Sequence, residues 1–209
     1  MSTGSIDGLR VIENFITPEE ESELISEIDN REWGGNGIPP NPEMKRRTQH
    51  YGYEFSYRHR NARYIGLLPS MFSFLLSRLV SEGIVPSPPD MCTVNEYNLK
   101  QGIMPHRDAS LFGPTILSLS LLSPCLMRFE KEGEDEIKVL LPIRNELSFF
   151  EFLPLAQRSL LVMTNSSRFD YKHSISKDEI EYLGDQKIVR GRRVSLTFRS
   201  LIKEESKME

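Results

Sequence analysis

Short runs of alternating apolar and polar residues dominate the chain from Cys92 to Arg199. Period-two alternation over four to eight residues is typical of half-buried strands. The runs are CTVNEYN, ILSLSLL, CLMRFEK, IKVLLP, SLLVMT, KHSIS and RRVSLTFR, with a turn at GIMPH and a further candidate at LSFFEF. Many short strands at this spacing predict a β-sandwich or jelly roll.

The first ninety residues have a different pattern, with two helices. LRVIENFI (9–16) alternates like a short strand, and Thr17 then begins a helix as N-cap, with Pro18 at N1 and Glu20 at N3. Pro69 opens a second helix, which we expect to end near Glu82. Glycines and prolines over 34–42 indicate an irregular loop between them.

Between the two helices lies a basic and aromatic stretch. Its aromatic residues recur at period two, which predicts a strand: they are Tyr51, Tyr53, Phe55 and Tyr57. The cations around them are Lys45, Arg46, Arg47, Arg58, Arg60 and Arg63. Such cations attract phosphates and such rings stack on bases, so the stretch is a candidate nucleic-acid contact. A solvated loop or an edge strand is the alternative.

These patterns predict one domain that is mainly β with flanking helices. We expect helices and the basic stretch over about 1–90, a jelly-roll core over about 91–202, and a disordered charged tail over 203–209. The 209 residues suit a single domain, and no linker divides them.

Composition indicates the cellular environment in which we expect the protein. Hydrophobic residues make up 38% and charged residues 27%, with a net charge of −4, so the whole chain is not a polycation. No apolar run reaches membrane-span length, and we see no secretory signal at the start. Cys92 and Cys125 are far apart, which favours buried, reduced thiols. We therefore expect an intracellular monomer in the cytoplasm or nucleus, and leave the redox role of the two thiols open.

Two histidines and one aspartate form a candidate metal face. In an extended segment His106 and Asp108 point to the same side, and His173 is reachable from a neighbouring strand. Two imidazoles and a carboxylate with open positions suit Fe(II) in an oxygenase. The His-x-Asp pair alone is a weak signal, because it also occurs by chance.

The last strand, RVSLTFR, has one polar and cationic face. Arg193, Ser195, Thr197 and Arg199 alternate with apolar residues. Guanidinium groups bind carboxylates through paired hydrogen bonds, so this face can hold a dicarboxylate such as 2-oxoglutarate. A surface strand with its polar face in water is the alternative. Asn95 and Tyr97 share a strand face and can add neutral hydrogen bonds, or can simply pack.

Together these residues resemble the AlkB family of Fe(II)/2-oxoglutarate dioxygenases, over about Leu9 to Leu201. The shared motifs are Asn95-x-Tyr97, His106-x-Asp108, His173 and the strand from Arg193 to Arg199. HYGYEF, GIMPHRD, ILSLSL and RSLLVMT are similar to the eukaryotic AlkB homologues eight and six. The resemblance implies a double-stranded β-helix with an N-terminal substrate lid, and Fe(II), 2-oxoglutarate and O2 as cofactors.

The resemblance also implies roles for the residues. His106, Asp108 and His173 would bind iron. Arg193 would pair with the distal carboxylate of 2-oxoglutarate, assisted by Asn95, Tyr97 and Ser195, and Arg199 with Thr197 would lie near the chelating carboxylate. The bacterial archetype has Asn where this chain has Ser195. The lid residues expected to touch the substrate are Arg46, Arg47, Tyr51 and Tyr53.

The expected substrate is nucleic acid, with RNA favoured over DNA. HYGYEF is closer to homologue eight, which favours hydroxylation of a modified wobble uridine in tRNA. Oxidative demethylation of N-alkylated bases and oxidation of a protein side chain are the alternatives, and a binding module without catalysis ranks last. The chain has no room for the added RNA-recognition and methyltransferase domains of animal homologue eight. RNA affinity would then come from the lid or from a partner protein.

Overall fold

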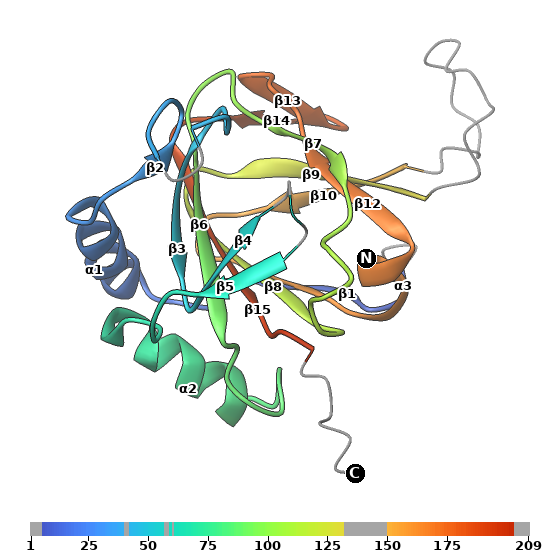
Figure 1. Cartoon of the computed structure of the whole chain (residues 1–209). Coiled ribbons are helices and arrows are strands. Elements are labelled where there is room, and N and C mark those ends of the chain that lie inside the picture. The colour runs from blue at the N-terminus through green and yellow to red at the C-terminus, as the bar shows by residue number, and fades with distance from the viewer. Residues whose placement is uncertain (1–5, 40–41, 57–58, 60, 132–149, 203–209) are drawn as a thin grey trace.

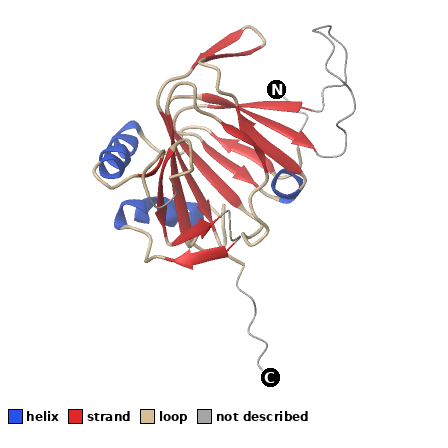
Figure 2. Ribbon diagram, turned by 45° about the horizontal axis from the view of Figure 1, so that its top comes forward, coloured by secondary structure: helices blue, strands red, loops and turns tan. Residues whose placement is uncertain are grey.

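Two facing antiparallel sheets form the body of the protein (Figure 1). The computed structural model describes residues 6–39, 42–56, 59, 61–131 and 150–202. The larger sheet has the order β1-β11-β8-β15-β6-β3-β2, and the smaller has β10-β9-β12-β7. Figure 2 shows the sheets opposite one another, with two helices outside the larger one. This arrangement confirms the predicted jelly roll with flanking helices.

The larger sheet contains β1 (Leu9–Ile12), β2 (Gly34–Gly35), β3 (Arg47–Tyr51), β6 (Met91–Tyr97), β8 (Ile116–Leu122), β11 (Leu160–Met163) and β15 (Arg193–Arg199). The smaller sheet contains β7 (Ile103–His106), β9 (Cys125–Lys131), β10 (Phe150–Leu155) and β12 (Tyr171–Ile175). Two hairpins complete the strands: β4 (Tyr53–Ser56) with β5 (Asn61–Tyr64), and β13 (Ile180–Leu183) with β14 (Gln186–Val189). The helices are α1 (Pro18–Asp29), a 3-10 turn η1 (Ser70–Phe72), α2 (Ser73–Ser81) and α3 (Asn165–Phe169).

Helix α1 begins where its capping residues predict. The Thr17 hydroxyl accepts from the Glu20 backbone N–H at 3.2 Å, and the Glu20 carboxylate accepts from the Thr17 N–H at 2.9 Å. Reciprocal capping satisfies two backbone donors that the helix itself leaves unpaired. Glu20 also accepts from Arg78 on α2 at 2.5 Å, which ties the two helices together.

Alternation along the larger sheet separates two cores. Outward apolar side chains such as Val94, Leu119, Leu196 and Phe198 pack against α1 and α2. Inward apolar side chains of the larger sheet, such as Met163, meet those of the smaller sheet, including Phe129. Because successive side chains point to opposite faces, the polar residues of β15 lie between the two sheets. The described helices include none long and apolar enough to span a membrane.

The structure corrects several sequence predictions. The aromatic stretch is two strands in different sheets, because Gly52 breaks it with φ +77° and a Cβ there would lie 2.0 Å from the carbonyl oxygen of Asp90. GIMPH was predicted as a turn, but its last four residues form the edge strand β7, where Pro105 is tolerated. The strand predicted over LRVIENFI ends at Ile12. The IKVLLP strand, Tyr57, Arg58, Arg60 and the charged tail lie outside the described residues.

Candidate active site

The candidate metal ligands meet between the two sheets. His106 on β7 and His173 on β12 are direct partners in the strand register, with ring centroids 4.3 Å apart. Asp108 lies two residues after the end of β7, and its Oδ2 lies 3.7 Å from Nε2 of His173. The side chains of Asp108 and His173 are 5% and 10% exposed. The structure therefore brings together all three residues that the sequence singles out.

The imidazole hydrogen bonds leave ligand nitrogens available. Nδ1 of His106 lies 2.9 Å from the carbonyl oxygen of Met104, and a carbonyl only accepts, so Nδ1 is the protonated nitrogen. Nε2 is then free to bind a metal. Burial lowers the pKa of His106, and burial together with nearby His106 lowers the pKa of His173 to about 3. Both rings are neutral near pH 7, as metal ligation requires.

Asp108 is held by Arg199 through one oxygen. Nε of Arg199 donates to Oδ1 at 2.7 Å and Nη2 lies 2.5 Å from the same atom. Burial acts to raise the pKa of Asp108, but the guanidinium and the two imidazoles outweigh it, so the pKa lies well below its ordinary value. Oδ2 is buried without a hydrogen-bond partner among the described residues. A buried carboxylate oxygen left over in this way is suited to bind a cation.

The donor set fits Fe(II). It consists of two neutral imidazoles and one carboxylate, the facial set of non-haem iron oxygenases. No three His, Cys, Asp or Glu side chains in the described ranges lie at the mutual spacing of a formed metal centre. Binding an ion here would therefore require the side chains of His106, Asp108 and His173 to move.

The buried imidazoles make folding stability depend on pH. In the unfolded chain His173 takes up a proton below about pH 6.5, whereas the folded protein resists it down to about pH 3. The unfolded state then binds more protons, so stability falls as the pH drops below 6.5. For His173 we expect a loss of about 2 kcal/mol between pH 6.5 and 5 in chelator-treated protein.

Urea unfolding at pH 7 and pH 5 tests this loss. His173→Gln should reduce the difference between the two pH values, whereas the exposed His59→Gln should leave it unchanged. Equal pH dependence in all three proteins would contradict the role of the buried ring.

The polar face of β15 lines a small cavity next to the candidate ligands. Its residues are Arg193, Ser195, Thr197 and Arg199, which are 1%, 3%, 8% and 8% exposed. They point between the sheets, so the alternative of a surface strand is wrong. The cavity of about 40 Å³ has room for a few waters. A dicarboxylate would enter only if the lining side chains move apart.

Arg193 is suited to bind a carboxylate. It is almost fully buried, and Nη2 donates to the Ser120 hydroxyl at 2.8 Å. Its Nε and Nη1 are buried without a hydrogen-bond partner among the described residues. Ser195 lies beside it, with its hydroxyl 3.0 Å from that of Ser118. Unsatisfied guanidinium donors in a polar cavity fit a carboxylate group of 2-oxoglutarate.

Tyr97 and Asn95 connect this cavity to the predicted lid. Two guanidinium groups contact the ring of Tyr97, with the Cζ atoms of Arg193 and Arg46 each 5.4 Å from its centroid. Nε of Arg46 donates to Oδ1 of Asn95 at 2.9 Å. Arg46 therefore contacts both residues that the sequence predicts to assist the cosubstrate.

The other lid candidates are directed elsewhere. Arg47 binds the Glu96 carboxylate at 2.6 and 2.7 Å. Tyr51 donates to Gln49 at 2.9 Å, and its ring packs against Phe72 in the core beneath the helices. Arg47 and Tyr51 thus lie on the opposite face of the larger sheet from the metal ligands. Tyr53 packs edge-on against Tyr64 in the β4–β5 hairpin, with ring centroids 5.3 Å apart.

Two further residues near the site were not predicted from the sequence. His50 pairs with Thr93 in the strand register. By strand alternation its side chain points to the same inward face of the sheet as that of Arg46, and this alternation could have identified it from the sequence. Burial lowers its pKa. Arg168 on α3 is buried and donates to the backbone carbonyls of Asp108 at 3.0 Å and Ala109 at 2.7 Å. Arg168 anchors the loop that carries Asp108, and no local motif signals this contact.

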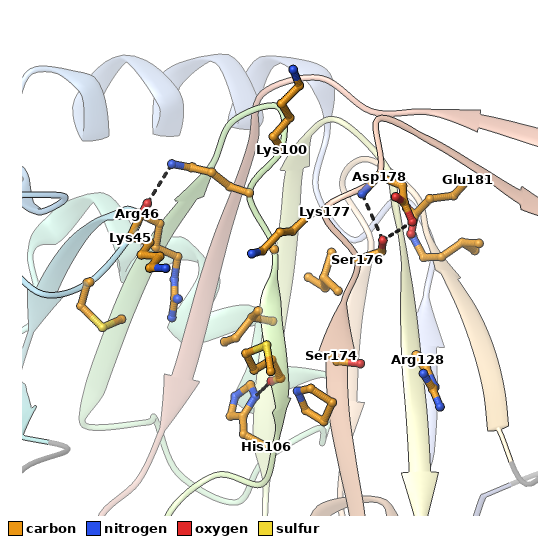
Figure 3. A pocket seen from close by; sticks show the side chains of 18 of the residues that line it. Lys45, Arg46, Lys100, His106, Arg128, Ser174, Ser176, Lys177, Asp178 and Glu181 are labelled. Carbon is orange, nitrogen blue, oxygen red and sulfur yellow. Dashed lines mark hydrogen bonds between the residues drawn. The ribbon is translucent and has the colours of Figure 1, made fainter. Parts of the chain in front are cut away.

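An open cleft of about 1100 Å³ leads from the surface to His106 (Figure 3). One wall contains residues 43–46 and the turn after β6. The other wall contains the end of β12 and the loop after it, with the outer face of β9 beyond. Arg46 belongs to the cleft and Tyr97 to the small cavity, and these two side chains are in contact.

The comparisons agree with this geometry. A family model described as the 2OG-Fe(II) oxygenase superfamily matches residues 8–199, so the chain is an oxygenase of this class. A protein of Arabidopsis thaliana named "Alkylated DNA repair protein ALKBH8 homolog" is 35% identical over 94% of this chain and 59% of its own length. The Xenopus tropicalis "tRNA (carboxymethyluridine(34)-5-O)-methyltransferase alkbh8" is 33% identical over 84% of this chain and 26% of its own. The chain belongs to the AlkB family, close to these relatives.

A solved structure supports the fold. The protein titled "The structure of OsALKBH1" superposes with a TM-score of 0.63 at 15% identity, covering 95% of this chain and all of that one. At this identity the match concerns the fold alone. The chain spans less than two thirds of the length of the Arabidopsis and Xenopus relatives. The activities of those whole proteins are therefore not assigned to this chain on similarity alone.

Proposed function

We propose that this oxygenase acts on RNA and hydroxylates a modified wobble uridine in tRNA. The observation that supports the proposal is the open cleft, which ends at the candidate ligand His106 and contains Arg46 beside the cosubstrate cavity. A cleft of this size accepts an extruded or single-stranded nucleotide. The Xenopus relative is named for a methyltransferase that acts on carboxymethyluridine 34 of tRNA, which supports this substrate class.

The chain's own residues would divide the work. Bound Fe(II) and 2-oxoglutarate would supply activated oxygen for a C–H bond of the substrate. His106, Asp108 and His173 would hold the metal, and Arg193 and Arg199 would orient the cosubstrate carboxylates. Arg199 also fixes the Asp108 carboxylate, and Arg168 fixes the loop beneath it. Arg46 would face the incoming nucleotide.

Mass spectrometry of nucleosides tests the proposal. tRNA is treated with the protein, Fe(II), 2-oxoglutarate and ascorbate, with His106→Ala as the control. We expect a gain of one oxygen on a modified uridine with the wild-type protein only. Loss of a methyl group from a base would instead establish demethylation. Consumption of 2-oxoglutarate without any change in tRNA would contradict the RNA proposal and direct the search to DNA or protein side chains.

A further inference from the structure

Three lysines from separate segments surround the cleft. Lys45 precedes β3, Lys100 lies in the turn after β6, and Lys177 follows β12. Figure 3 shows Lys177 directed across the cleft toward the side that carries Lys45 and Arg46, with His106 below. All three lysines are exposed, and the protein as a whole has a net charge of −4. Five cationic residues and three carboxylates line the cleft, so it is net positive in a protein of negative overall charge.

These three segments are fastened to one another. Nε2 of Gln101 donates to the carbonyl of Lys45 at 2.9 Å. The buried Arg190 donates to the carbonyl of Gln101 at 3.0 Å and to that of Ser176. Gly102 lies so close to β12 that a Cβ would be 2.3 Å from the carbonyl oxygen of Ile175. The backbone positions of the lysines are thus fixed before any ligand arrives, which reduces the entropy lost on binding.

The lysine side chains remain available. Neither Lys45 nor Lys177 forms an ion pair with a carboxylate of the described residues. Lys100 lies 3.9 Å from Glu179, but its side chain is 82% exposed, and such a surface pair contributes little. Three carboxylates also line the cleft: Glu43, Asp178 and Glu181. Glu181 accepts from the Leu126 N–H at 3.1 Å, and Asp178 accepts from the Ser176 hydroxyl. An anionic ligand therefore meets unneutralised ammonium groups.

Apolar side chains lie beyond these cations. Met104 and Phe152 line the cleft and are 76% and 49% exposed. An exposed aromatic ring beside cations is the combination by which proteins hold single-stranded nucleic acid, since bases stack while phosphates pair. A free phosphate or a small anion would use the lysines alone and leave these apolar surfaces uncovered.

We infer that Lys45, Lys100 and Lys177 bind the sugar–phosphate backbone of a single-stranded RNA segment whose target base reaches His106. This inference rests on the proposed function and adds the surface that holds the strand. Arg46, deeper in the cleft, links that strand to Tyr97 and Asn95. Residues of the jelly roll, and not only the lid, would supply RNA affinity.

Fluorescence anisotropy with a labelled, unmodified anticodon stem-loop RNA tests the inference. The double variant Lys45→Glu/Lys177→Glu should weaken binding at least tenfold. The slope of log K against log salt should become shallower by about 1.4, for two lost phosphate contacts on a single strand. The control Lys131→Glu/Lys187→Glu has the same net charge but lies outside the cleft, and should change binding less than twofold.

Turnover of 2-oxoglutarate without RNA distinguishes a failure of this inference from a failure of the proposed function. It should be the same in the wild type and both double variants, since none of these lysines contacts the cosubstrate cavity. Equal RNA affinity of the two double variants would overturn the inference and leave the proposed function standing. A wild-type protein that consumes 2-oxoglutarate but neither binds this RNA nor adds oxygen to tRNA in the nucleoside assay would overturn both.

Discussion

Replacing Asp108 or His173 by Ala should reduce 2-oxoglutarate turnover by more than about a thousandfold. Loss of an outer-shell partner already lowers metal affinity or activity by about 10–100-fold, and loss of a ligand removes more. With Asp108 gone, Arg199 also loses its buried carboxylate partner, so this variant should be less stable than His173→Ala. Succinate formation measures the turnover, and thermal unfolding separates the two variants.

Asp185→Ala is the matched control, because it removes a carboxylate at the turn between β13 and β14, remote from the ligands. It should keep full turnover. Calorimetric titration with Co(II) gives a readout independent of activity: metal binding should be lost in Asp108→Ala and His173→Ala and kept in Asp185→Ala. Tight metal binding by His173→Ala would refute the assignment of this residue as a ligand.

Arg193→Met should raise the KM for 2-oxoglutarate at least about a hundredfold, and yet make the cosubstrate-free protein more stable. A buried guanidinium–carboxylate pair that loses one partner costs about 3–5 kcal/mol, equivalent to more than a hundredfold in affinity. Without cosubstrate, however, Nε and Nη1 of Arg193 are buried and unpaired among the described residues. Removing that charge should add about 2 kcal/mol to the free energy of unfolding, or several degrees.

Its neighbour Arg192 is the control for this effect. Arg192 pairs with Asp29 and Glu96 on the other face of the sheet. Arg192→Met should therefore lower the unfolding temperature and leave the KM unchanged, and so differ from Arg193→Met in both measurements. Arg193→Lys keeps the positive charge but loses the paired donors of the guanidinium group. Its KM should therefore lie between those of wild type and Arg193→Met. A lower unfolding temperature for Arg193→Met would show that the guanidinium already has a compensating partner.

Local chemistry explains what the sequence predicted well. Helix α1 begins at the expected residue because Thr17, Pro18 and Glu20 act within one turn. The position of β15 followed from its alternation, although its inward direction depends on the strands on both sides. The β13–β14 hairpin was not predicted, although Gly184-Asp185 between two short runs with apolar residues is a hairpin signal.

The remaining features depend on tertiary contacts. The break at Gly52 exists because the Asp90 carbonyl approaches it, thirty-eight residues (90 − 52) along the chain. The directions of Arg46 and Arg47 follow from the pairing of β3 with β6, which turns one toward Asn95 and the other toward Glu96. The hydrogen bond from Arg168 on the short helix α3 to the backbone carbonyl of Asp108 joins the helix to a distant loop, and no propensity rule specifies it.

The place of β15 in the larger sheet has a consequence for biosynthesis. β15 pairs with β8 on one side and β6 on the other, and no described strand of the β1-β11-β8 group pairs with one of the β6-β3-β2 group. While the ribosome has made only the residues before Arg193, the two groups have no common partner. Closure of the sheet, and with it the pocket around Arg193 and Arg199, must wait for β15 to emerge. The nascent chain is thus incompetent for cosubstrate binding until that late moment, and long-range pairing of this kind folds slowly.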